Sequence, residues 1–450
     1  MRHPIREMLA ALLLVVLTAG CGGTSIPSVL STPAGRSEAP GASTKGPTVP
    51  GVPGLAKAAV ERTIADPADA ALAAEAINDF GLELLRNAAA GENAVLSPAS
   101  IVLALAMARA GAQGDTAVEM DEVLRGAAAD ANSGWLNALD AALAMRSGTF
   151  KDRFNKDADV LLRIANESFG QQGFPLESAY LEALASRFGA GVRLVDFIEH
   201  AEDARHQINA WVKDQTEDRI PELLPPGTVD SLTRLVLVNA IYLKAAWHVP
   251  FLLEGTKPAA FRGLDGAKVD VPTMHGSSGF RYAEGDGWQA VELPYVGRQL
   301  AMLVILPDDL RAFEARLDGH GLSQITAALE DRLVTLALPR FGIESKVTMN
   351  QVLADMGMPL AFDPDKADFD GISSADDDLY ISAVIHQANI DVDEEGTEAA
   401  AATGVVVGTT SAGPEPVTMT VDRPFLFALR DLETGAILFL GRVVEPMERN

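Results

Sequence analysis

The chain has 450 residues, of which 48% are hydrophobic, and its formal net charge is −26. This length allows one large domain or two to three smaller ones, and the apolar fraction supports a sizeable core. We expect no nucleic-acid partner, because such an acidic surface repels phosphate backbones. The negative charge either keeps the protein soluble or steers it toward basic partners.

The first 21 residues have the pattern of a secretion signal. Arg2 and Arg6 precede Met8–Leu17, an apolar run too short to span a bilayer, and small residues follow it. The end of this segment, LTAGC, resembles a bacterial lipoprotein signal, although Thr18 stands where a leucine is usual. We predict a signal peptide at 1–21 that ends at Cys21, whose lipidation tethers the chain to the outer face of a bacterial membrane. An ordinary cleaved signal with a free thiol is the alternative.

Residues 22–70 are rich in Gly, Pro, Ser, Thr and Ala and show no hydrophobic period. This composition predicts a disordered stalk. A coil of that length spans roughly 35–40 Å, enough to hold a domain clear of a lipid surface. From residue 71 onward the pattern is globular, without internal repeats, so we expect a single domain over 71–450.

The secondary-structure pattern of this domain is uneven. Residues 72–90 have apolar positions at helical spacing, and Ser97 followed by Pro98 suits a helix start. The next helix is apolar almost all round, which predicts burial. Further helices are expected at 181–188, 204–213, 322–328 and 347–356, and strands at 158–169, 235–243, 299–306 and 333–338. Helices dominate the first half and strands the second, which favours an α+β fold with a large, mostly antiparallel sheet.

Catalytic and metal-binding motifs are absent from the sequence. There is no G-x-S-x-G, H-E-x-x-H, Walker or paired C-x-x-C pattern. His200 and His206 have the wrong spacing for two ligands on one helical face. We therefore expect no enzyme, no metal and no cofactor.

The segment 394–416, EEGTEAAAATGVVVGTTSAGPEP, lacks every large apolar residue. As a strand, it would place Thr397, Ala399, Ala401, Thr403, Val405 and Val407 on one small, uncharged face. Its other face starts with Glu398 and stays small. Its glycines and prolines also suit a loop. The segment is thus compatible with two states, a loop and a central strand.

EEGTEAAAAT resembles the hinge of an inhibitory serpin's reactive-centre loop. Blocks that resemble this family follow in family order: LSPASIVLALAMARAGAQGDTAVEM, INAWVKDQTEDRIPELLPPG, LVNAIYLKAAWHVPF, IHQANIDVDEEGTEAAAAT and VDRPFLFALRDLETGAILFLGRV. The resemblance implies an α+β serpin domain at 71–450 with a large main sheet, further sheets and eight to nine helices. It also implies an exposed reactive-centre loop at 394–416.

The resemblance implies a suicide substrate of serine proteases, and of some cysteine proteases, that inserts its hinge into the main sheet after cleavage. In the register of the family, the reactive bond joins Thr410 to Ser411. A register shifted by one residue, with Thr409 or Ser411 as the last residue before the cut, is left open. A neutral residue before the cut favours elastase-like or subtilisin-like targets over trypsin-like ones, or selects no target sharply. The implied hinge comprises Glu394, Glu395, Gly396, Thr397, Glu398, Ala399, Ala400, Ala401, Ala402 and Thr403.

Five further residues match family positions that control opening of the sheet. They are Ser97, Ser100, Asn239 and His386, a buried polar cluster, and Trp247, where insertion begins. A structural role is equally open for each, because buried polar groups need partners in any case. Two departures stand out: Asp218 replaces a usual glycine, and Arg423 replaces a usual histidine before the C-terminal Pro-Phe.

The resemblance therefore predicts a secreted, lipid-anchored, monomeric inhibitor. A non-inhibitory serpin that serves as a binding or chaperone-like protein is the alternative, which the small residues of the hinge disfavour. A ligand-binding lipoprotein receptor would explain the signal and the stalk, but it would not explain the hinge.

Overall fold

The computed structural model describes residues 54–88, 91–373, 375, 379–398 and 415–447. Contacts divide the chain into Met1–Thr44 and Lys45–Asn450, and every described residue lies in the second unit. The predictions for Cys21 and for most of the stalk therefore fall outside the described residues. No helix in the described ranges is long and apolar enough to cross a membrane.

Helices occupy mainly the first half of the described chain. The second, α2, has all twelve residues buried, as its uniformly apolar sequence predicts. Ser97 stands at its N-cap position, but the serine side chain makes no capping hydrogen bond. The described helices are α1 (Asp69–Ala88), α2 (Pro98–Arg109), α3 (Gly114–Val123), α4 (Trp135–Ala144), α5 (Ser178–Ala183), α6 (Phe197–Gln215), α7 (Leu310–Arg316), α8 (Gly319–Ala327) and α9 (Asn350–Asp355).

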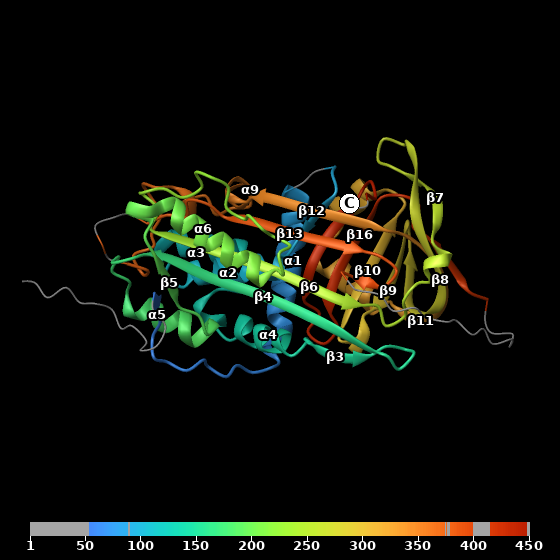
Figure 1. Ribbon diagram of the computed structural model, residues 1–450, viewed down its shortest axis with the longest axis horizontal. Helices are drawn as coiled ribbons and strands as arrows, with labels where there is room; N and C mark the ends of the chain where they lie inside the picture. Colours follow the sequence, from blue (N-terminus) through green and yellow to red (C-terminus); the bar gives the residue numbers. More distant parts are fainter. Residues whose placement is uncertain (1–53, 89–90, 374, 376–378, 399–414, 448–450) are drawn as a thin grey trace, which may run out of the picture. The chain divides into compact units, whose positions relative to one another are not determined.

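The main sheet has the strand order β1-β5-β4-β6-β14-β13-β12, with β3 paired to β4 (Figure 1). All its pairings are antiparallel except that of β4 with β5. A small apolar cluster, including Ile208, Val212, Val236 and Val238, joins α6 to one face of the sheet. The strands are β1 (Leu55–Ala56), β3 (Gly148–Lys151), β4 (Asp157–Gln171), β5 (Val192–Val195), β6 (Leu235–Ala246), β12 (Phe341–Thr348), β13 (Ile385–Val392) and β14 (Gly396–Thr397).

The second sheet has the order β15-β11-β8-β9-β10-β16-β17-β2, with β7 paired to β8. At its centre, all eight residues of the apolar run LAMLVILP in β10 are buried. Its strands are β2 (Ala94–Leu96), β7 (Lys257–Arg262), β8 (Lys268–Gly285), β9 (Trp288–Pro294), β10 (Leu300–Pro307), β11 (Glu330–Pro339), β15 (Val417–Thr420), β16 (Phe425–Asp431) and β17 (Ile437–Val443). Both sheets are mostly antiparallel, and the α+β prediction is confirmed.

The folded part begins earlier than the predicted boundary at residue 71. Leu55 pairs with Arg193 at the edge of the main sheet. Farther along, Arg62 Nε donates to Asn137 Oδ1 at 2.8 Å, and the Thr63 amide donates to the Ser186 carbonyl at 2.8 Å. The end of the predicted stalk is thus corrected, because an unpaired strand edge and fixed polar partners order it without any hydrophobic period.

The predicted helix at 347–356 is also shorter than expected. Val347 and Thr348 end β12, where they pair with His386 and Ile385 of β13, and the helix α9 begins only at Asn350. The ladder to β13 overrides local helix propensity at these two positions.

Candidate functional site: the hinge and the lane between two strands

In the described residues, β14, the strand between β6 and β13 in the main sheet, is two residues long. Gly396 and Thr397 of β14 pair with Ala246 and Ala245 of β6, and Thr397 also pairs with Val392 of β13. Beyond β14, no backbone ladder in the described residues joins β6 directly to β13. We call this unladdered stretch between the two strands the lane. Its walls run parallel to each other, so an added strand would be antiparallel to both.

Gly396 fits closely against β6 because it has no side chain. Its φ is +155°, and a Cβ there would lie 2.1 Å from the Ala245 carbonyl oxygen and 2.8 Å from the Ala246 Cα. Both obstacles are backbone atoms, which side-chain rotation cannot move aside. Any other residue would force β14 away from β6.

Thr397 turns its side chain into the core beneath the sheet. It is 3% exposed, and its Oγ1 lies 2.6 Å from the hydroxyl of Tyr295. Burial raises the pKa of Tyr295, so the phenol stays protonated and hydrogen-bonded. The Tyr295 ring stacks on Trp247 with centroids 4.5 Å apart. Thr397 therefore lies on a small, uncharged, inward face, as the alternation of the segment predicts.

Trp247 holds the backbone on the approach to β14. Its indole Nε1 donates to the Asp393 carbonyl at 2.9 Å, and its amide donates to the Glu395 carbonyl at 2.8 Å. Glu394 is buried beside it, where Arg340 Nε donates to Glu394 Oε1 at 2.8 Å and the Thr256 hydroxyl donates to the same oxygen. These contacts fix the base of the hinge before the strand begins.

The strand β14 ends at Thr397, and the next residue, Glu398, has a left-handed φ of +53° while its amide donates to the Asp391 carbonyl of β13 at 3.2 Å. Its carboxylate lies 3.2 Å from Arg219 Nε and is 3% exposed. Burial, together with this neighbouring carboxylate, raises the pKa of Tyr242 to about 12. The predicted exposed loop at 394–416 is thus corrected at its start, since Glu394, Gly396 and Thr397 are buried. Ala399, Ala400, Ala401, Ala402, Thr403, Thr410 and Ser411 lie outside the described residues.

Four predicted polar residues lie where α2 meets the walls of the lane. The Ser97 amide donates to His386 Nε2 at 3.1 Å. The Ser100 hydroxyl donates to Asn239 Oδ1, and the Asn239 amide donates to Asn166 Oδ1. Burial lowers the pKa of His386 to about 4, so this imidazole is neutral at pH 7. Trp247 is separate from this cluster. Control of opening by these residues stays a prediction.

The sequence did not reveal several residues that hold the hinge. Tyr295 lies 102 positions from Thr397, and no local pattern marks it. Asn166 likewise lies within the ordinary strand sequence of β4, and Arg340 lies between β11 and β12 without any local signal. Arg219 occupies a stretch that departs from the family pattern, but its contact with Glu398 has no sequence signal. In the described ranges, no group of three or more His, Cys, Asp or Glu residues is placed to hold a metal ion.

The described residues define the class: a two-sheet α+β domain in which a two-residue strand lies between two strands that run parallel to each other. The model of the serpin (serine protease inhibitor) family matches residues 75–446. Leukocyte elastase inhibitor of Bos taurus is 39% identical over 380 residues, which cover 82% of this chain and 97% of that protein. The chain therefore belongs to the serpin family.

Solved structures agree with this assignment. The native state of tengpin, a thermophilic serpin, matches with a TM-score of 0.74 at 28% identity, over 86% of this chain and 96% of that one. Cleaved Serpin 42Da matches with a TM-score of 0.73 at 35% identity, over 85% of this chain and 100% of that one.

Proposed function

We propose that this chain inhibits serine proteases as a suicide substrate, through cleavage of its loop and insertion of the freed hinge into the lane. The two-residue strand β14 carries the proposal, because it already holds the first positions of a strand between β6 and β13. Family membership and the similarity to leukocyte elastase inhibitors support serine protease inhibition in general.

The register of β14 determines where each later residue would go. Seven steps beyond the pair Gly396–Ala246, Thr403 would stand opposite Asn239. Six steps beyond the pair Thr397–Val392, the same residue would stand opposite His386. Thr403 would thus enter the buried polar cluster, where its hydroxyl can both donate and accept hydrogen bonds. This convergence supports insertion and a gating role for Asn239 and His386.

The far end of the lane suits the valines of the segment. In the same register, Val405 and Val407 would stand opposite Leu237 and Leu235 of β6. Those leucines line an apolar pocket together with Phe369, Ile372, Leu379 and Ile381. Burying two valines there adds an apolar gain to the new ladder bonds. Since β6 has 12 residues, complete pairing would extend about 40 Å.

Cleavage supplies the freedom that insertion needs. The protease serine Oγ attacks the Thr410 carbonyl carbon, the bond to Ser411 breaks, and the released amine of Ser411 takes the proton. An ester then joins Thr410 to the protease. Insertion drags the enzyme along the sheet, and its distortion separates the nucleophile from the base that would activate a water for deacylation. The same logic extends to cysteine proteases that form a thioester.

The target follows from the loop chemistry. No Lys or Arg occurs between Glu394 and Asp422, so trypsin-like enzymes lack the cation that their acidic S1 pocket requires. A threonine before the cut suits the small apolar pockets of elastase-like or subtilisin-like enzymes. The similarity to proteins named leukocyte elastase inhibitor supports this choice.

A protease panel tests the proposal. The protein is mixed with elastase, subtilisin and trypsin, and the products are separated in SDS. We expect a resistant band at the summed mass with elastase or subtilisin and none with trypsin. Mass spectrometry of the released C-terminal peptide locates the cut at Thr410 or one residue away. Loop cleavage by every enzyme, with full recovery of protease activity, would contradict inhibition.

Membrane attachment through Cys21 is a separate part of the proposal. The lipoprotein-type sequence supports lipidation of this cysteine and display outside a bacterial cell. In a bacterial host, Cys21→Ala should move the protein from the membrane fraction to the soluble fraction. An unmodified thiol in the mature wild-type protein, detected by intact mass, would instead support the ordinary signal.

A further inference from the structure

The N-terminal end of the described chain lies far from the hinge along the main sheet. Leu55 of β1 pairs with Arg193 of β5. Across the next two strands, Arg193 pairs with Phe169 of β4, and Phe169 pairs with Val236 of β6, so these four residues form one row. The hinge begins opposite Ala246 of β6, ten positions from Val236. Ten strand residues span about 33 Å.

Residues 54–56, which we call the root, are held at this end of the sheet by residues 57–66, which we call the strap. Lys57 Nζ donates to a carbonyl in the loop that precedes β5. Farther along the strap, Arg62 Nη1 pairs with Asp140 of α4 at 2.7 Å. Because these contacts join the strap to the body, a tether that leaves the root starts at the end of the sheet rather than beside α1.

The C-terminal end of the described chain lies beside the hinge. The Gly342 amide of β12 donates to the Met447 carbonyl at 2.7 Å. Gly342 pairs with Asp391 of β13, and the next residue, Val392, pairs with Thr397. The two ends of the described chain are therefore at opposite ends of the main sheet, and attachment through one end is not equivalent to attachment through the other.

The residue that would carry the protease after insertion ends near the root. In the register of β14, Thr410 would lie fourteen positions beyond Gly396, which is four positions past the row of Leu55. This offset is about 13 Å along the strands, and the four strand spacings to β1 add about 19 Å across them, which gives a separation of about 23 Å. A protease domain of about 230 residues has a radius of gyration of about 17 Å, so the trapped enzyme would lie beside the root.

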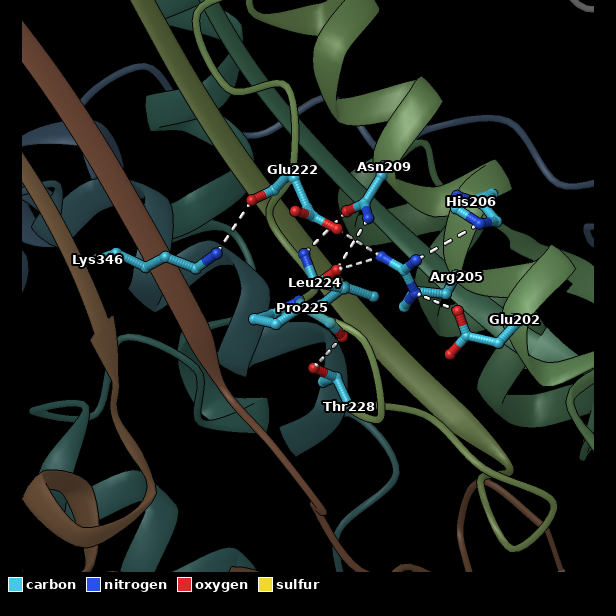
Figure 2. A network of polar contacts seen from close by, with 9 residues as sticks. All are labelled: Glu202, Arg205, His206, Asn209, Glu222, Leu224, Pro225, Thr228 and Lys346. Carbon is cyan, nitrogen blue, oxygen red and sulfur yellow. Dashed lines mark hydrogen bonds and ion pairs between the residues drawn. The ribbon is translucent and has the colours of Figure 1, made fainter.

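The turn 225–234, which precedes β6 at the same end of the sheet, is held in place. Just before it, Arg205 Nη1 and Asn209 Nδ2 of α6 each donate to the Leu224 carbonyl at 2.9 Å (Figure 2). Both donors belong to buried side chains, so water does not compete for these bonds. Leu232 is exposed on the turn. An arriving protease would thus meet a fixed surface with an apolar side chain.

We propose that attachment through the root lets this chain carry a trapped protease onto the membrane to which the chain is anchored. The proposal rests on the proposed function and adds a direction to it. Before cleavage, the loop holds the bound protease at the hinge end, away from the root. After insertion, the enzyme lies beside the root and therefore beside the lipid, where it is withdrawn from substrates in the surrounding medium.

Energy transfer to a lipid surface measures this direction. Cys21 is the single cysteine of the sequence, so residues 21–450 couple at one place to a maleimide lipid in phosphatidylcholine vesicles. The headgroups carry an acceptor dye, and elastase or subtilisin carries a donor dye. The covalent complex is compared with the non-covalent complex of a protease whose catalytic serine is replaced by alanine. We expect the donor to lie about 30 Å closer to the lipid in the covalent complex, so that energy transfer rises.

Moving the tether to the other end of the chain provides a matched control. Cys21→Ser removes the original coupling site, and a copy of residues 22–53 followed by one cysteine is added after Asn450. The stalk sequence is unchanged, so its own length cancels in the comparison. Since the C-terminal end lies beside the hinge, energy transfer should fall, not rise, when this protein forms the covalent complex.

The strap is tested by a double variant. Lys57→Ala with Arg62→Ala removes both contacts and should reduce the difference in energy transfer between the two complexes, because the tether then starts farther from the end of the sheet. Arg125→Ala, which breaks an exposed ion pair with Glu83, should leave the difference unchanged. An undiminished difference in the double variant overturns the role of the strap, and urea unfolding checks that each variant is folded.

The outcomes separate carriage from inhibition. Equal energy transfer in both complexes of the chain coupled through Cys21 overturns the proposal, even where an SDS-resistant band forms. Absence of that band contradicts inhibition and carriage together. The non-covalent complexes need no cleavage and still test the root, since energy transfer must be lower for coupling through Cys21 than for C-terminal coupling. The reverse order overturns the position assigned to the root.

Discussion

The two sheets of this molecule differ in how completely they are paired. In the second sheet, β10 pairs with β9 over seven successive positions and with β16 over six. In the main sheet, the strand between β6 and β13 has two residues within the described part of the chain. Among the described residues, the second sheet has continuous ladders at its centre, whereas the main sheet has no ladder between β6 and β13 beyond β14.

Under the proposed mechanism, this difference locates the metastability of the fold. Backbone groups that lack a ladder lose net stabilisation of roughly 1 kcal/mol each. These missing ladder bonds are confined to the lane. The main sheet can therefore gain stability by pairing with an added strand while the second sheet stays unchanged. Kinetic trapping, rather than equilibrium stability, would hold the uncleaved chain in this state. The following predictions test the contrast, from the largest expected effect to the smallest.

Cleavage within the loop should stabilise the protein more than any point substitution. About ten new ladder positions, each adding roughly 1 kcal/mol, correspond to a rise in melting temperature of about 10–20 °C. Calorimetry before and after limited proteolysis measures it. Equal melting temperatures for the intact and nicked chains would mean that the lane stays empty.

Thr397→Arg should convert the inhibitor into a substrate. A cation would have to replace a hydroxyl that is 3% exposed and bonded to Tyr295, which costs several kcal/mol. We expect loop cleavage without an SDS-resistant complex and without the rise in melting temperature. Thr397→Val, of similar shape, should still trap protease. A full yield of complex from the arginine variant would refute insertion at this position.

Arg442→Ala tests the stability of the second sheet. Arg442 in β17 is 3% exposed, and its Nη1 donates to Glu314 at 2.6 and 2.7 Å. Its loss leaves a buried carboxylate unpaired, so we expect a loss of about 3–5 kcal/mol in urea unfolding. The loss should be equal for cleaved and uncleaved protein. Arg423→Ala, which breaks contacts to the exposed Asp308 and Asp422, should cost less than about 1 kcal/mol.

His386 should make the lane sensitive to acid. Its pKa is about 4 in the folded protein against 6.5 for the free side chain, so the unfolded chain binds more protons between these values. The stabilisation is present above pH 6.5 and is lost as the pH falls toward 4, by about 3 kcal/mol. Urea midpoints at pH 7 and pH 4.5 should differ less for His386→Gln than for wild type. An unchanged pH slope in the variant would remove His386 from this role.

Much of the fold could be predicted from the sequence because its patterns are local. The apolar run after Pro98 predicts a fully buried helix, the strand-like run at 235–243 lies within β6, and the run at 299–306 matches β10 except for its first residue. The alternation around Thr397 also predicts that it belongs to a small, uncharged face. These features depend on periodicity alone.

What sequence analysis missed depends on distant partners. Leu55 forms a strand because the edge of β5 offers unpaired backbone groups, not because of its own neighbours. The base of the hinge is buried because Arg340, Thr256 and Tyr295 meet it from other elements. The sequence allowed either a loop or a strand at this point, and tertiary contacts selected the strand for its first residues.

The close fit of Gly396 against β6 has a kinetic consequence. Joining a free segment to a sheet normally requires a search for register and the entropy of a first contact. Here that first contact exists before any bond is cut. Under the proposed mechanism, insertion would therefore start from an existing contact, and only elongation of the strand would compete with the attacking protease.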